Sequence, residues 1–201
     1  MSNLRSILLL LSQKYGATRR LYHGGSVPGL KDLQPFTRAG ETVPLLWVTP
    51  EQAWAERWAF EKDTKNPILY TGRFLHELNI FNGRCKTDWI SLLAYCGLYA
   101  KYENIIKNGD WLDLNKKLIS GMDRDFLLQV IKELGYDGIH NFEVDAFSGI
   151  GLFEGANFTV DMEYHWDWKN KVWTSSYASH LQMLKPDEGA RVHIELWDGI
   201  V

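Results

Sequence analysis

The sequence predicts an α+β fold with a mostly antiparallel sheet. Helical spacing of apolar residues occurs early and in the middle of the chain, whereas strict alternation of apolar and polar residues dominates its last part. Helices and strands that separate in this way along a chain are typical of sheets built from antiparallel neighbours. No internal repeat or low-complexity tract interrupts the 201 residues, so we expect a single domain over 1–201.

The first expected elements are a helix, a short strand and a long loop. Apolar residues at helical spacing predict a helix over 2–15. Residues 20–23 are then expected to be a short strand that runs into a Gly-Gly pair. The segment 24–44 holds four glycines and three prolines, which predicts a long loop. Long loops inside compact domains are often functional.

The middle of the chain carries a clear helix start. Residues 45–48 read as a short buried strand, and Thr49-Pro50-Glu51-Gln52 follows at once. Thr49 is expected to cap the helix, Pro50 to occupy its first position and Gln52 to complete a capping box. Two further apolar segments bounded by turn residues, 68–73 and 77–81, are expected to be strands.

The remaining elements follow from periodicity. Residues 88–107 are helical by period, and 123–134 give the clearest helical pattern, with Asp123 at its start and Gly135 after its end. Its apolar face is expected to hold Phe126, Leu127, Val130, Ile131 and Leu134. Strands are expected at 136–142, at 151–153, over the alternating stretch 158–168 with one buried face, and, after a turn at 169–171, at 191–197.

Composition narrows the class of protein. The net charge of −3 argues against a nucleic-acid partner, because such proteins usually carry a basic excess. Cys85 and Cys96 show no zinc-ligand spacing and are expected to be reduced, so no metal is expected. The apolar run 7–11 is too short to span a bilayer and no cleavage site follows it. We therefore expect a cytoplasmic protein with no membrane partner.

Three motifs, in order, carry a resemblance to a known family. They are Leu21-Tyr22-His23-Gly24-Gly25-Ser26, Leu46-Trp47-Val48-Thr49-Pro50 and Leu134-Gly135-Tyr136-Asp137-Gly138-Ile139. Together they resemble the ADP-ribosyltransferase superfamily, whose fold is shared by diphtheria-like toxins and poly-ADP-ribose polymerases, and more narrowly its bacterial or phage effectors. The resemblance covers about 20–155. It implies split antiparallel sheets flanked by helices, with a core over about 20–160 and a C-terminal β extension over about 158–201.

The resemblance implies a binding site for NAD as co-substrate. In family members with a strand-borne His-Gly pair, the imidazole holds the adenosine-side ribose and the glycine backbone binds the nicotinamide amide, which would assign these roles to His23 and Gly24. A residue without a β-carbon lets the backbone approach a ligand closely. The alternative is a half-buried histidine before a Gly-Gly turn.

Aromatic residues are expected beside the nicotinamide. Trp47 occupies a strand position where many family members carry an aromatic residue, and Trp58 lies eleven residues later, inside the expected helix. Two indoles would suit a planar pyridinium through stacking and cation–π attraction. The alternative is that both are core residues. Thr49 is included with them among the expected NAD-binding residues. The segment 134–139 is expected to be structural.

The catalytic carboxylate is the least defined part of the expected site. In the family, a glutamate at the start of the strand after the Gly-Tyr-Asp-Gly segment stabilises the oxocarbenium-like ribose. The matching stretch, 148–153, starts without an acid. The candidates are Glu143, then Asp145, then Glu154, and the alternative for each is a solvated surface acid. Arg38, in the long loop, is expected to meet the NAD pyrophosphate.

These residues lead to three hypotheses for function. The first is a mono-ADP-ribosyltransferase that moves ADP-ribose from NAD to a macromolecular acceptor, expected to be a protein, and that acts in a host cytoplasm if it is phage-encoded. The second is a related enzyme on the same fold, an NAD glycohydrolase or, less in keeping with the acidic chain, an RNA 2′-phosphotransferase. The third is a non-enzymatic module that binds a partner through exposed aromatics of the strand 158–173.

Overall fold

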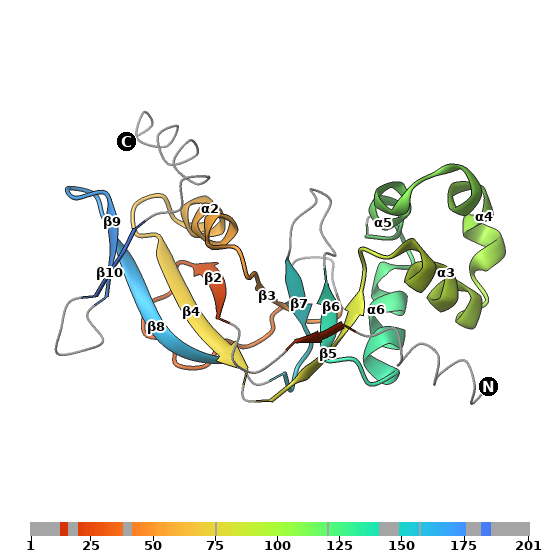
Figure 1. Ribbon diagram of the computed structural model, residues 1–201, viewed down its shortest axis with the longest axis horizontal. Coiled ribbons are helices and arrows are strands. Elements are labelled where there is room, and N and C mark those ends of the chain that lie inside the picture. The colour runs from red at the N-terminus through yellow and green to blue at the C-terminus, as the bar shows by residue number, and fades with distance from the viewer. Residues whose placement is uncertain are drawn as a thin grey trace. The chain divides into compact units, whose positions relative to one another are not determined.

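The fold combines two β-sheets with several helices, which confirms the α+β class (Figure 1). The computed structural model describes residues 13–15, 20–37, 42–74, 76–119, 121–140, 149–156, 158–175 and 182–185. Within these residues most strand pairs are antiparallel, whereas β5 (Leu78–Asn82) and β6 (Gly138–His140) pair in parallel. The expected predominance of antiparallel pairing is therefore confirmed. None of the helices described there is long and apolar enough to cross a membrane.

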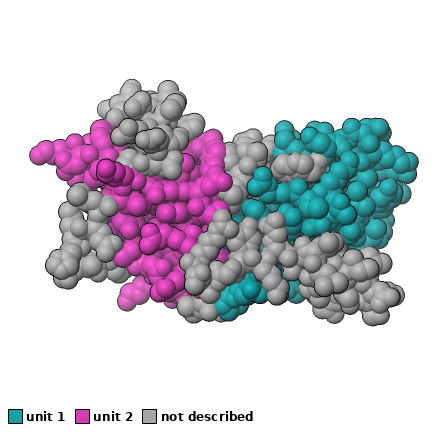
Figure 2. Space-filling model, viewed as in Figure 1, with its two compact units in different colours: residues 1–16, 34–47, 76–156 teal, residues 17–33, 48–75, 157–201 magenta. Residues whose placement is uncertain are grey.

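The chain divides into two compact units, each made of three stretches of sequence (Figure 2). The first unit contains 1–16, 34–47 and 76–156, and the second contains 17–33, 48–75 and 157–201. The second unit holds both the His-Gly strand and the long alternating strand. The alternating strand, expected as a C-terminal extension, is thus part of the same unit as the first motif.

The first unit contains a five-stranded sheet of order β1-β5-β6-β7-β3. In addition to β5 and β6, this sheet contains β1 (Gln13–Tyr15), β7 (Ile150–Leu152) and β3 (Leu46–Val48). β1 corrects the expected helix over 2–15, because its three residues pair with β5 instead; residues 2–12 lie outside the described part of the chain. Strand pairing with a distant segment has here overridden a local helical pattern.

Four helices of the first unit are α3 (Lys86–Tyr95), α4 (Tyr99–Asn108), α5 (Trp111–Ile119) and α6 (Arg124–Glu133). The helix expected over 88–107 is in fact two helices, α3 and α4. Gly97 lies between them at a φ of 71°, a conformation that breaks a helix and that glycine adopts without strain. The helix expected over 123–134 is confirmed as α6, although Phe126 is half exposed rather than buried on the apolar face.

The second unit contains a five-stranded antiparallel sheet of order β10-β9-β8-β4-β2. Its strands are β2 (Leu21–Gly25), β4 (Ile68–Phe74), β8 (Phe158–Asp167), β9 (Val172–Ser175) and β10 (Gln182–Leu184). The single helix described in this unit, α2 (Gln52–Lys62), packs against β2 and β4 (Figure 1). The expected strand 158–168 and turn 169–171 are confirmed, whereas 191–197 lies outside the described residues.

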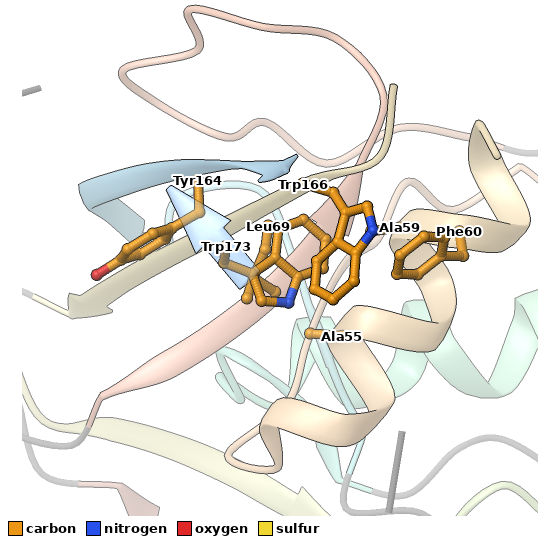
Figure 3. Close-up of a cluster of buried hydrophobic side chains, with 7 residues drawn as sticks. All are labelled: Ala55, Ala59, Phe60, Leu69, Tyr164, Trp166 and Trp173. Carbon is orange, nitrogen blue, oxygen red and sulfur yellow. The ribbon is translucent and has the colours of Figure 1, made fainter. Parts of the chain in front are cut away.

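An aromatic cluster joins α2 to this sheet (Figure 3). The rings of Trp166 and Trp173 lie 5.2 Å apart between centroids, and the ring of Phe60 on α2 packs edge-on against Trp166 at 5.5 Å. Trp173 is completely buried. Aromatic pairs at such distances stabilise a core beyond the effect of their buried area. The cluster contains Ala55, Ala59, Phe60, Leu69, Tyr164, Trp166 and Trp173.

Candidate functional site

The two faces of β2 carry residues with different surroundings. Successive residues of a strand point to opposite faces, so His23 and Gly24 do not share one. Gly24 is on the helix face, where an added β-carbon would lie 2.1 Å from the carbonyl oxygen of Ala55 and 2.4 Å from the backbone nitrogen of Ala59. Only glycine fits there, because the helix backbone touches the strand. Packing against α2 alone therefore accounts for a glycine at position 24, without any contact between its backbone and a ligand.

His23 begins a row of polar residues across three neighbouring strands. It pairs in register with Tyr70 of β4, and Tyr70 pairs with Glu163 of β8. Leu69 and Tyr164, the neighbours of Tyr70 and Glu163 in sequence, belong to the cluster under α2, so this row occupies the opposite face. The rings of His23 and Tyr70 lie 6.2 Å apart between centroids. We call His23, Tyr70 and Glu163 the polar row.

The loop that follows β2 covers the polar row. The hydroxyl of Tyr70 donates a hydrogen bond to the carbonyl oxygen of Val27, and the backbone N–H of Gly29 donates to Oε2 of Glu163 at 2.7 Å. Further along, the N–H of Val160 donates to the carbonyl oxygen of Lys31 at 3.3 Å. These bonds hold the segment 27–31, which we call the covering loop, across the sheet. Tyr70 and Glu163 are consequently buried.

Both oxygens of the buried carboxylate have partners. Oε2 of Glu163 accepts the bond from Gly29, and Oε1 lies 2.7 Å from Nε2 of His165. His165 is two residues later on the same face of β8, and its side chain is 45% exposed, whereas that of Glu163 is 5% exposed. A buried carboxylate, which can attract a positive charge or accept hydrogen bonds from hydroxyl groups, therefore lies next to an imidazole that reaches solvent.

The two tryptophans of the expected aromatic clamp lie in different units. Trp47, on β3 in the first unit, is buried, and its ring packs on Gly151, where an added β-carbon would lie 3.2 Å from an indole carbon. Trp58, on α2 in the second unit, is half-buried beside Gly24. The Trp47 indole therefore packs within its own unit, and the β-carbon of Trp58 lies against β2 in the other. The clamp around a nicotinamide stays a prediction.

Thr49 connects β2 to the start of α2. Its backbone exchanges two hydrogen bonds with Tyr22, and its hydroxyl accepts a bond from the N–H of Glu51 at 3.1 Å. The expected helix start is wrong: α2 begins at Gln52 with Glu51 at its N-cap position, so Thr49 does not cap the helix and Pro50 precedes it. The Gln52 side chain donates to Glu56, and the N–H of Thr49 donates to Tyr22 instead of to a capping-box side chain. Thr49 is buried, with its hydroxyl engaged in this turn.

The third motif has the structural role that the sequence predicts. Gly135, at a φ of 91°, ends α6. An added β-carbon on Gly138 would lie 2.4 Å from the carbonyl oxygen of Gly151 on the neighbouring strand, so close strand packing requires a glycine. Asp137 accepts a hydrogen bond from the N–H of Asn79 at 2.8 Å and thereby anchors β6 to β5.

Of the expected charged site residues, only Glu154 is described. It is exposed and its carboxylate lies 4.0 Å from Nζ of Lys132, as in an ordinary surface ion pair. Glu143, Asp145 and Arg38 lie outside the described residues. Sequence reasoning missed Glu163, which belongs to the polar side of the alternating strand. The pair Glu163 and His165 on one face of a strand is a signal that could have found it.

Comparison with known proteins adds no assignment. No protein-family model, curated protein or solved structure matches this chain. Within the described residues, no group of three or more His, Cys, Asp or Glu side chains could hold a metal ion. The case for a function therefore depends on the polar row and on the motifs of the sequence.

Proposed function

We propose that the chain is a mono-ADP-ribosyltransferase that uses NAD and modifies a protein acceptor, and that its fold is ADP-ribosyltransferase-like. The observation that carries the proposal is the polar row, in which a histidine that precedes a glycine lies in register with a tyrosine and a buried glutamate on adjacent strands. The sequence motifs add the resemblance to that superfamily. The histidine and the carboxylate lie in one row of the sheet, on the two strands that flank β4, and a carboxylate in such a row is suited to stabilise a developing positive charge.

The reaction needs stabilisation of a positively charged sugar. The bond between nicotinamide and the ribose carbon breaks, nicotinamide leaves with the bonding electrons, and an acceptor nucleophile bonds to the same carbon and loses a proton. A carboxylate close to the ribose 2′-hydroxyl stabilises the charge that develops. Glu163 is a candidate for this role beside Glu143 and Asp145, and His23 would hold the adenosine-side ribose. The covering loop would open when NAD enters, as active-site loops often do.

The structure does not support the hypothesis of a non-enzymatic module that binds a partner through exposed aromatic residues. It required Tyr164, Trp166 and Trp168 to face solvent, but Tyr164 and Trp166 are buried in the cluster under α2 and Trp168 packs against it. Glycohydrolase activity on the same fold differs from transfer only in using water as acceptor. The experiment below therefore separates these two outcomes directly.

The test is to incubate the protein with NAD radiolabelled in its adenylate phosphate, with and without cell lysate. Label on a lysate protein is the expected result. Release of free ADP-ribose with no labelled protein would favour the glycohydrolase. Absence of both, together with no NAD binding by calorimetry, would overturn the proposal.

Substitutions then identify the acid. Glu163→Gln, Glu143→Gln and Asp145→Asn each keep the side-chain shape and remove the charge. The true catalytic acid should lose about 100-fold or more in turnover with NAD binding largely retained. Glu154→Gln is the control, since this side chain is exposed and in an ordinary surface ion pair. His23→Ala should weaken NAD binding; unchanged affinity would remove His23 from the site.

A further inference from the structure

A surface groove runs between α4 and α5 in the first unit. It consists of two adjoining hollows of about 490 and 640 Å³ that share Asn104, Ile105 and Lys117. One hollow continues to Gly109, where α4 ends, and the other to Met122, just before α6. Hollows of this size are within the range of ligand-binding sites. We call the combined feature the α4–α5 groove.

The lining of the groove is basic, although the whole chain is acidic. Lys101, Lys116 and Lys117 line it, against one acid, Asp113. Nζ of Lys101 lies 2.6 Å from Asp123, so its charge is partly balanced there. Both Lys116 and Lys117 are exposed, and two asparagines also line the groove. The lining thus holds three lysines against one acid, although the chain has a net charge of −3, and this composition favours an acidic partner.

One end of the groove carries an exposed apolar side chain. Met122 lines this end and is 95% exposed, the highest fraction among the large hydrophobic residues described. Ile105 is half-buried along the groove. Methionine is common on surfaces that bind varied protein partners, because its flexible side chain adapts to them. Apolar side chains next to a basic groove fit a partner with apolar and acidic side chains together.

These observations favour a protein segment over a nucleic acid. A surface for single-stranded nucleic acid usually combines a longer basic track with several aromatic platforms and arginines. The α4–α5 groove has three lysines and no arginine among its lining residues. We infer that it docks an acidic, partly apolar segment of another protein, lying along α4 and α5 as in other helix-in-groove recognition. This inference goes beyond the proposed function and does not depend on NAD chemistry.

The test uses the full chain and a defined probe. The probe is a fluorescein-labelled peptide of about 15 residues in which pairs of glutamate and leucine alternate, long enough to span roughly 22 Å as a helix. Anisotropy should show saturable binding that weakens steeply as salt rises from about 50 to 300 mM. A peptide with lysine in place of glutamate should not bind. Failure of the acidic peptide to bind, or tighter binding of an oligothymidine, would overturn the inference.

Variants locate the binding. Lys117→Glu should weaken the acidic peptide about tenfold, and Met122→Ser should weaken it about threefold. Lys65→Glu makes the same change in net charge at an exposed position of the second unit and should change affinity less than about twofold. Equal effects of Lys117→Glu and Lys65→Glu would show that only net charge matters and would contradict docking in the groove. Circular dichroism checks that each variant is folded.

Discussion

The two faces of the second sheet each bury a glutamate, but in different ways. On the helix face, Oε1 of Glu56 accepts hydrogen bonds from the indole N–H of Trp173 at 2.8 Å and from the Gln52 amide at 2.7 Å. On the loop face, Glu163 is held by a loop N–H and by a half-exposed histidine. The first carboxylate is fixed within a packed aromatic cluster. The second is buried beneath the covering loop and contacts a partly exposed imidazole, and it is therefore the one that the proposed function assigns to a ligand.

The largest effect should come from the helix face. Trp173→Ala removes a completely buried indole and the donor to Glu56, so it should cost about 3–5 kcal/mol of the free energy of unfolding. His165→Ala, on the loop face with a side chain 45% exposed, should cost less than about 1 kcal/mol. Urea unfolding followed by circular dichroism measures both. Similar losses would mean that the two faces are equally rigid.

Adjacent glycines of β2 give a matched pair for the same comparison. Gly24→Ala forces a methyl group into the backbone of α2 and should cost about 2–3 kcal/mol. Gly25→Ala places the methyl group on the loop face, where the nearest atom, Cε2 of Tyr70, is 3.4 Å away, and should cost less than about 1 kcal/mol. The same unfolding assay applies. If Gly25→Ala were the more harmful, the assignment of faces would be wrong.

Release of the covering loop should have a smaller effect on stability. Tyr70→Phe removes the hydroxyl that bonds to Val27 and should cost about 1 kcal/mol. Cleavage of the loop by a nonspecific protease should become faster, because local opening is easier than global unfolding. The rate of cleavage within 27–31, mapped by mass spectrometry, is the measurement. An unchanged rate would show that the tyrosine does not hold the loop.

The smallest expected effect is on the alkaline side of pH. Burial in the helix-face cluster raises the pKa of Tyr164 above its usual 10.0. Because the folded protein holds this proton more tightly than the unfolded chain, the stability it contributes is complete below pH 10 and is lost as pH rises through the folded pKa. Tyr164→Phe should therefore reduce the fall in thermal stability between about pH 9 and 11. An identical fall in both proteins would exclude this contribution.

The pattern of β8 shows what sequence could and could not predict. Strict alternation correctly placed Tyr164 and Trp166 on a buried face. It predicted one buried face only, yet Glu163 on the opposite face is buried as well, because a loop more than a hundred residues earlier in the chain covers that side. Alternation reports which face is apolar, but only the tertiary fold decides whether the polar face is covered.

The same limit explains the misjudged helices. The helical periodicity of apolar residues continues through 88–107, yet the helix is interrupted after α3. The interruption is visible only in the structure, where Gly97 has a positive φ. Residues 13–15 continue a helical pattern but pair with Ile80, Asn79 and Leu78 as a strand. Local spacing sufficed for α6 and for the glycines of 134–139, where the structure depends on neighbours in sequence. Of the polar row, only His23 could be predicted from the sequence, because Tyr70 and Glu163 come from other strands that are distant along the chain.

The covering loop is hydrogen-bonded to side chains of the sheet through its own main-chain atoms, the N–H of residue 29 and the carbonyl oxygen of residue 27. Every amino acid supplies that carbonyl, so the bond places no demand on the side chain at position 27, while a φ of 78° still favours glycine at 29. The outward side chains of this segment are thus free to diverge through evolution without loss of closure. A surface of this kind can be retuned toward new molecular targets while the buried glutamate and tyrosine beneath it stay the same.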